Sequence, residues 1–288
     1  MNKLSFTTTG CWGLAEGFGC ASLGLPGVCD NSENRVVEYA NELESFAITG
    51  SYSQILQEVR IIVEGNKIKA AVVVFGNAGG ENVFLKDLQE IIHCPMVGGG
   101  AAIDGATGRS GLIPGDGPAA VLLITDDRYT YEAVTECIHD QILDTCCVTF
   151  DDPRTLRTIN GVDAKEYLAE KKRELGLPET DFEHITLSDM RNVNAHLSCV
   201  DGVIKSGRDV NEKMLLRYVS HEKVYGAMHA FYNDPNAIVF GCAGLSGLLD
   251  RPLDTSSLGL FLFGEVCTVD GVAEFGNLML SKLIIKTK

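Results

Sequence analysis

Two uninterrupted apolar runs, each leading into glycine, constrain the fold of this chain more than any other feature. Residues 70–75 read Ala-Ala-Val-Val-Val-Phe and residues 237–240 read Ala-Ile-Val-Phe. Both end in Phe-Gly-x-Ala-Gly, where x is Asn77 in the first run and Cys242 in the second. Such runs are typical of strands buried on both faces, as in the central sheets of α/β proteins. We therefore expect two buried central strands.

Helices and strands are expected to alternate around these runs. Apolar residues recur at helical spacing in four segments, at about 51–65, 81–93, 163–175 and 220–232. Short apolar runs predict further strands at 95–98 and 119–124. The alternation favours a mixed α/β fold.

A second glycine-bearing strand is expected about twenty residues after each apolar run, at 96–101 and at 260–265. This repeated pattern predicts two similar α/β halves related by internal duplication. The alternative is that two buried strands are similar by chance. We place the halves at 1–150 and 151–288; the glycine- and cysteine-rich start of the chain fits no periodicity. Because α/β proteins bind ligands at the carboxyl ends of their strands, we expect a pocket between the halves.

Charge and cysteine usage exclude several classes of function. Lys+Arg number 24 and Asp+Glu 39, so the net charge is −15. This charge argues against binding to nucleic acid, and against binding to a membrane surface through a basic patch. The chain shows no apolar signal segment or membrane span, so we expect a cytoplasmic protein with reduced cysteines. The 10 cysteines lack zinc-site spacing, and we expect no metal. Cys11, Cys20 and Cys29 recur every nine residues, which leaves a metal or redox role for them open.

The 31 glycines gather in three segments, 1–30, 76–117 and 241–276. Glycine serves positions where the backbone takes positive φ or comes close to another group, so we expect Gly98, Gly99 and Gly264 to let the backbone approach a ligand. No dinucleotide or P-loop motif is present, and we expect no cofactor. In the same segment Asp104 and Arg109 are candidate ligand contacts. The Arg109 guanidinium suits a carboxylate, with a solvated loop charge as the alternative.

The C-terminal glycine cluster contains further candidates. Glu265 follows an apolar strand and Gly264, and acids in such places are rarely buried without a partner, so Glu265 is expected to bind a ligand donor. Cys242 lies in a strand-to-loop turn, where it can line a pocket or act as a nucleophile. Asn277, between Gly276 and Leu278, can orient a ligand or satisfy a turn.

These motifs resemble the FIST domain family of intracellular signal-transduction sensors. The resemblance rests on a cysteine turn at 238–244, a strand ending in Gly-Glu at 259–266 and an asparagine turn at 275–277. Residues 157–167 are similar to the family's linking segment, and residues 97–105 to its glycine-rich loop. By this resemblance residues 1–150 are a FIST N-like half and residues 151–288 a FIST C-like half.

The resemblance implies a sensory protein that binds a small ligand such as an amino acid and signals through a protein partner. The chain departs from the family pattern at Leu245 and Gly276, where arginine and histidine are common. An alternative is an enzyme acting on a small metabolite, with Cys242 as nucleophile or Glu265 as general base. A purely structural interaction module is a third interpretation.

Overall fold

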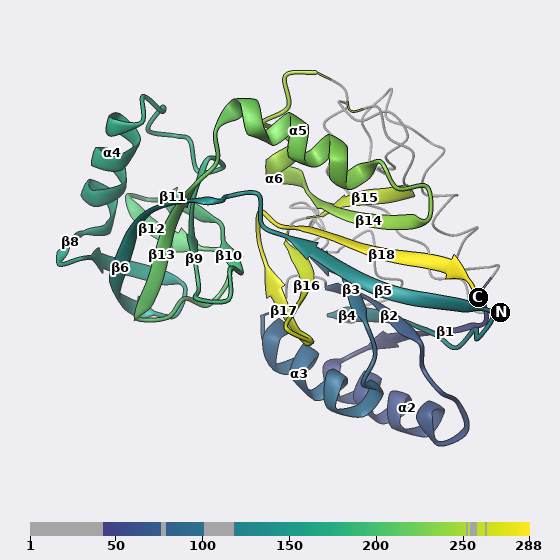
Figure 1. Ribbon diagram of the computed structural model, residues 1–288. Coiled ribbons are helices and arrows are strands. Elements are labelled where there is room, and N and C mark those ends of the chain that lie inside the picture. The colour runs from purple at the N-terminus through teal and green to yellow at the C-terminus, as the bar shows by residue number, and fades with distance from the viewer. Residues whose placement is uncertain (1–42, 76–78, 101–117, 252, 254–257, 263) are drawn as a thin grey trace, which may run out of the picture.

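The mixed α/β fold expected from the apolar runs is confirmed by the computed structural model. The structure describes residues 43–75, 79–100, 118–251, 253, 258–262 and 264–288, and every statement below concerns these residues. It contains two sheets that pack face to face, and a separate lobe of strands with one helix (Figure 1).

The first sheet is formed mainly by the N-terminal part of the chain. Its six strands lie in the order β1-β4-β2-β3-β16-β17. The chain enters it through β1 (Ser45–Gly50), a strand that the sequence patterns did not predict. The expected elements follow as α2 (Tyr52–Gly65), β2 (Ala70–Phe75), α3 (Glu81–Ile92), β3 (Met96–Gly100) and β4 (Ala119–Ile124). Ser51 caps α2 and forms a reciprocal capping box with Gln54, which fixes the start of that helix.

The second sheet is formed by the C-terminal part of the chain and one earlier strand. Its order is β15-β14-β18-β5, and the hairpin β16–β17 leaves it to join the edge of the first sheet. The elements are β5 (Tyr129–Glu136), α5 (His221–Tyr232), β14 (Ala237–Cys242), α6 (Ala243–Ser246), β15 (Leu258–Leu262), β16 (Glu265–Val269), β17 (Val272–Gly276) and β18 (Leu280–Thr287).

The two sheets repeat one topology. In the first, β2 pairs with β3 in parallel and with β4 antiparallel, and β1 lies antiparallel outside β4. In the second, β14 pairs with β15 in parallel and with β18 antiparallel, and β5 lies antiparallel outside β18. The repeated sequence pattern thus corresponds to two similar four-stranded units. They do not divide near residue 150, however, because β5 opens the second unit and residue 150 lies within β6 (Gln141–Asp152).

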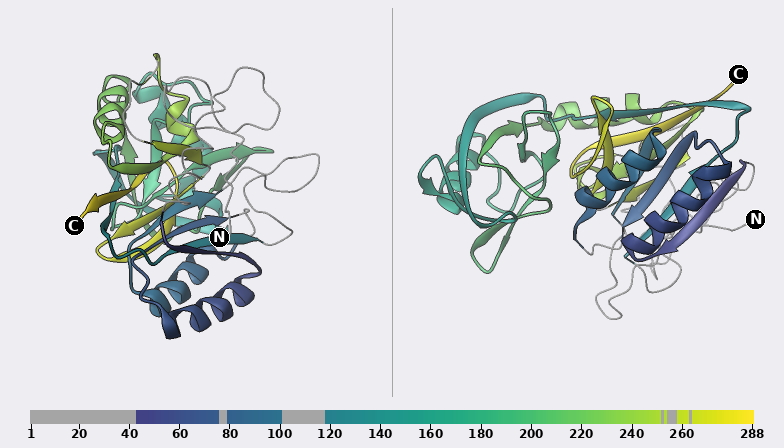
Figure 2. Two further views of the ribbon diagram at one scale, coloured as in Figure 1. Left: turned by 90° about the vertical axis from the view of Figure 1, so that its right-hand side faces the viewer. Right: turned by 90° about the horizontal axis from the view of Figure 1, so that it is seen from below.

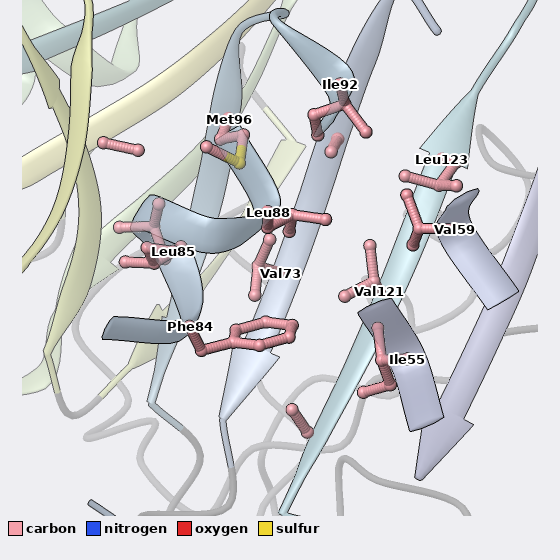
Figure 3. Packing of buried hydrophobic residues seen from close by; sticks show 14 of the residues in the cluster. Ile55, Val59, Val73, Phe84, Leu85, Leu88, Ile92, Met96, Val121 and Leu123 are labelled. Carbon is pink, nitrogen blue, oxygen red and sulfur yellow. The ribbon is translucent and has the colours of Figure 1, made fainter. Parts of the chain in front are cut away.

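Four layers result from this arrangement, with helices on both outer faces (Figure 1). Helices α2 and α3 cover the first sheet, where Phe84 and Leu88 pack against Val73 (Figure 3). The inner face of that sheet packs on the second sheet through residues such as Val72 and Phe240, and α5 and α6 cover the far side. Alternate residues of β2 therefore enter different cores, which explains why that run is uninterrupted.

The lobe is formed by residues 141–219, between β5 and α5, and lies beside the layered core (Figure 2). Asp163 caps its helix by accepting from the amides of Lys165 and Glu166. Its sheet has the order β10-β9-β13-β6-β7-β12-β11, with β8 beside β7, and encloses its own apolar cluster. Besides β6 its elements are β7 (Thr155–Ile159), β8 (Val162–Asp163), α4 (Ala164–Glu174), β9 (Ile185–Ser188), β10 (Asn194–Ala195), β11 (Leu197–Val200), β12 (Val203–Ser206) and β13 (Lys213–Tyr218).

Candidate functional site

The glycines at the ends of β3 and β16 bring two strands together. Gly99 pairs with Glu265 across these strands, and the Gly100 amide donates to the Gly264 carbonyl oxygen at 2.8 Å. A Cβ on Gly98 would lie 1.9 Å from the Val73 carbonyl oxygen, and one on Gly99 would lie 2.1 Å from the Gly264 oxygen. The close approach that these glycines permit is thus between backbone segments of the protein, where we had expected a ligand.

Gly264 has a related role beside the next turn. Its φ of +99° is in the region that favours glycine, and a Cβ there would lie 2.3 Å from Cζ of Phe275 and 2.8 Å from Nδ2 of Asn277. Gly264 thereby lets Glu265 and Asn277 approach each other from neighbouring turns.

Glu265 is the most unusual residue of this region. Its side chain is fully buried, and Oε2 accepts from the Met279 amide at 3.0 Å, whereas Oε1 has no hydrogen-bond partner among the described residues. Burial raises the pKa of Glu265 well above its usual range, because desolvation outweighs the Met279 amide and the nearby Cys242 thiol. Burial thus favours the protonated, neutral form of this carboxyl group.

Cys242 lies next to this carboxyl group, at the end of β14. Burial is the main cause that raises the pKa of its thiol well above the usual range, and Glu265 adds to it. The backbone amides of Leu245, Leu278 and Gly244 act in the opposite direction without reversing the shift. Cys242 is therefore a neutral thiol at pH 7, and burial disfavours in both members of the pair the charged form that nucleophilic or general-base chemistry requires.

Asn277 connects this pair to the lobe. It is 7% exposed. Its backbone N–H donates to the backbone carbonyl oxygen of Asn194 at 3.0 Å, and its side-chain Oδ1 accepts from the backbone N–H of His196 at 3.3 Å. The next residue, Leu278, has φ of +53°, which is strained for a non-glycine residue. The turn at 277–279 thus holds the Glu265 carboxyl at one end and the lobe at the other.

A second set of polar residues completes the junction from the lobe side. Asn194 Nδ2 donates to the Leu278 carbonyl oxygen at 3.2 Å and lies 3.3 Å from Nδ1 of His139. Nε2 of His139 lies 2.7 Å from the Glu183 carbonyl oxygen, so it carries the proton and Nδ1 accepts. Burial lowers the pKa of His139 to about 4 and keeps it neutral. Sequence reasoning missed these residues, since no motif links them to the C-terminal turn.

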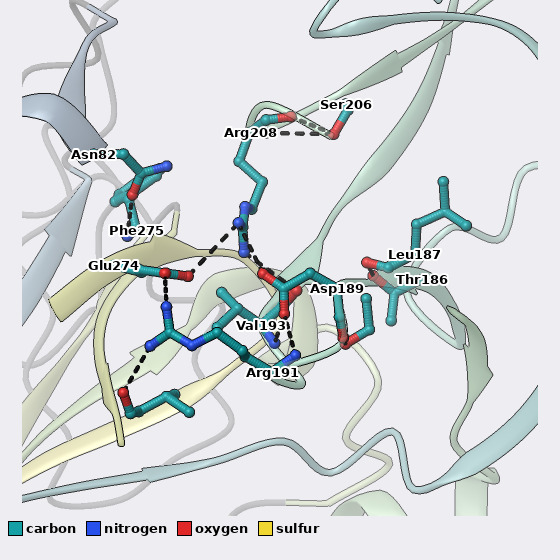
Figure 4. A network of polar contacts seen from close by, with 12 residues as sticks. Asn82, Thr186, Leu187, Asp189, Arg191, Val193, Ser206, Arg208, Glu274 and Phe275 are labelled. Carbon is teal, nitrogen blue, oxygen red and sulfur yellow. Dashed lines mark hydrogen bonds and ion pairs between the residues drawn. The ribbon is translucent and has the colours of Figure 1, made fainter. Parts of the chain in front are cut away.

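An ion-pair network also joins the lobe to the β16–β17 hairpin (Figure 4). Arg208 Nη2 lies 3.1 Å from Asp189 Oδ2 and 3.8 Å from Glu274 Oε2, and Arg191 pairs with the same glutamate. Arg191 Nη2 also donates to the Val269 carbonyl oxygen at 2.7 Å. The lobe is therefore fixed to the core by two polar clusters, one around Asn277 and one around Glu274.

The structure places Cys242, Gly264, Glu265 and Asn277 near one another, and their role as one ligand site stays a prediction. Asp104 and Arg109 lie outside the described residues, as do Cys11, Cys20 and Cys29. No protein-family model and no curated protein sequence matches this chain. The FIST resemblance therefore rests on its motifs alone.

Within the described ranges, no group of three or more His, Cys, Asp or Glu side chains is arranged to hold a metal ion. Of the helices in that part of the chain, none is long and apolar enough to cross a membrane.

Proposed function

We propose that this protein is a FIST-type sensor that binds an amino acid or a similar small metabolite at the junction of core and lobe. The observation that supports this most is the unpartnered Oε1 of the fully buried Glu265. A buried polar atom without a partner costs folding free energy, and proteins keep such costs mainly at functional sites. A ligand hydroxyl or ammonium group would supply the missing partner.

The turn at 277–279 offers a route from the ligand to the lobe. A ligand on Glu265 would compete with or reinforce the Met279 amide, two residues from the Asn277 contact with His196. The strained φ of Leu278 makes this turn a candidate for two alternative conformations. Ligand binding would then shift the population of lobe positions, and a cytoplasmic protein partner would read that shift.

The enzyme alternative is favoured by one observation, the three backbone amides that act on the Cys242 sulfur. They would stabilise a thiolate if the pair were opened to water. Against this, burial raises the pKa of both Cys242 and Glu265 in the closed structure and so favours the neutral form of each. We therefore place binding before catalysis.

Thermal-shift screening with amino acids and small carboxylic acids at millimolar concentration tests the proposal. A ligand at 100 times its Kd stabilises the native state by about 2.7 kcal/mol, which corresponds to a Tm increase of roughly 5–10 °C for a chain of this size. We expect such an increase for the wild type and its loss in Glu265→Gln. Asp126→Asn is the matched control, because Asp126 is also a buried acid but pairs with Arg128 away from the junction.

Two results would contradict the proposal. One is the absence of any stabilising metabolite for the wild type. The other is an undiminished ligand response in Glu265→Gln, which would place the binding site elsewhere.

A further inference from the structure

The lobe contains a cavity that is separate from the Glu265 pair. Its volume is about 430 Å³, and it lies between α4 and the hairpin β11–β12. Leu168, Phe182, Leu197 and Ile204 form its apolar walls. A volume of this size is in the range of small-molecule sites, which combine apolar walls with a few polar groups.

Lys172 is the polar group that distinguishes this cavity. Its side chain is only 2% exposed, and it occupies the buried stripe of α4, four residues after Leu168. Its Nζ donates to the Glu179 carbonyl oxygen at 2.7 Å and lies 3.1 Å from the centre of the Phe182 ring. The lysine on the apolar face of a predicted helix is the sequence signal that could have identified this site.

Lys172 differs from its neighbour Lys171 in its lack of an anionic partner. Lys171 Nζ pairs with Glu174 Oε2 at 2.9 Å, whereas no carboxylate of the described residues lies within ion-pair distance of Lys172 Nζ. Burial without a paired carboxylate lowers the pKa of Lys172 to about 8. Roughly a quarter of the molecules would then carry a neutral amine at pH 7.5, against about one in a thousand for an ordinary lysine.

We propose that this cavity captures a small carbonyl compound with an apolar body, an aldehyde or an α-oxo acid, as an imine on Nζ of Lys172. The neutral amine attacks the carbonyl carbon to give a carbinolamine. This intermediate then loses its oxygen, which leaves as water with the two hydrogens of the amine, and a C=N bond remains. The step is reversible and requires no oxidant or reductant.

Other groups of the cavity fit this chemistry. His196, whose Nε2 lies 3.7 Å from Glu183 Oε1, lines the same cavity and can exchange the proton that the departing oxygen needs. The exposed Lys165 provides a cation for the carboxylate of an α-oxo acid. Glu265 and Cys242 do not line the cavity, so this proposal is independent of ligand binding at the junction.

Borohydride trapping tests the proposal on the full chain. The probes are 3-methylbutanal and 4-methyl-2-oxopentanoate, with 4-methylpentanoate as the carboxylate without a reactive carbonyl. Reduction should fix one adduct, heavier than the protein by the mass of the probe less one oxygen, and peptide mapping should locate it at Lys172. A response to the aldehyde alone would assign no role to Lys165, and a preference for the oxo acid would support its contact with the carboxylate.

Two variants and a pH series make the test decisive. Lys172→Met should abolish the adduct, whereas Lys165→Met should retain the adduct with 3-methylbutanal. The rate of capture by Lys172 should rise less than about twofold between pH 8 and pH 9, because its amine is already half neutral, whereas an ordinary lysine gains about tenfold.

Three outcomes would overturn the inference. They are no adduct on the wild type, adducts spread over exposed lysines, and an adduct that persists in Lys172→Met. The mapping on the wild type requires no variant, so a folding defect of Lys172→Met would not leave the question open.

Discussion

Replacing Glu265 with glutamine should stabilise the protein at neutral pH, by an amount that grows as the pH rises. The substitution keeps the size of the side chain and an oxygen that can accept from the Met279 amide, but it removes the group that titrates. Glu265 is fully buried, and its pKa is raised well above the usual range. The native state therefore holds this proton at pH values where the unfolded chain has released it.

The sign and size of the effect follow from this difference in bound protons. In the unfolded chain the carboxyl has a pKa near ~4.3, so the stability contributed by the buried group is fully present below that pH. Above it the unfolded state gains from ionisation, and stability falls by about 1.4 kcal/mol per pH unit until the raised native pKa is reached. Within that interval each pH unit should cost the wild type about 1.4 kcal/mol relative to Glu265→Gln.

Urea unfolding of both proteins at several pH values between about 5 and 8 measures this difference. Asp126→Asn is the control of opposite sign. Hydrogen bonds from Arg128 lower the pKa of Asp126 to about 2, so its charged form stabilises the native state. That stability is fully present above the unfolded pKa and is lost as the pH falls toward 2, so this variant should be destabilised across the whole range. A Glu265→Gln difference that does not change with pH would show that Glu265 is ionised in the native state and would refute the reasoning.

Three further predictions concern Gly98 in β3, the ion pairs that fix the lobe to the core, and the buried thiol of Cys242. Gly98→Ala should lower the free energy of unfolding by roughly 3 kcal/mol or more in urea titrations, since its Cβ would lie 1.9 Å from a carbonyl oxygen. Gly226→Ala, whose Cβ would lie in open space on α5, should raise the free energy of unfolding by about 0.5–1 kcal/mol. Arg208→Met should cost about 3 kcal/mol in the same assay because it leaves the buried Asp189 without its ion-pair partner. The exposed Arg157→Met should cost less than about 1 kcal/mol. Cys242 should resist iodoacetamide at pH 7.5 in native protein while the exposed cysteines react, as read by peptide mapping; rapid labelling would favour the enzyme alternative.

The layered core could be predicted from the sequence to a large extent. The apolar runs at 70–75 and 237–240 identified β2 and β14, and apolar spacing identified α2, α3 and α5 within a few residues. These predictions succeed because burial on both faces of a strand, or on one face of a helix, leaves a local pattern. The repeated topology is also visible in the sequence, as the similarity between the two apolar runs and the glycines that follow them.

The candidate site could be predicted only in part, because its contacts join residues that are distant in the chain. Glu265 was recognisable as an acid after an apolar strand, but the missing partner of Oε1 depends on how β16 meets β3. The ion pairs of Glu274 with Arg191 and Arg208 span more than sixty residues and follow no periodicity. The glycine motif likewise predicted that the backbone lies close to another group, but it did not predict which group this is.

The hairpin β16–β17 explains why the site lies where it does. It follows β15 of the second unit in the chain but pairs with β3 of the first sheet. This pairing buries Glu265 and brings Glu274 to the arginines of the lobe. One hairpin therefore contacts both sheets and the lobe, so any displacement of Glu265 has to be accommodated at the polar contacts that fix the lobe to the core. This mechanical connection, more than any single side chain, supports the proposal that the junction acts as a sensor.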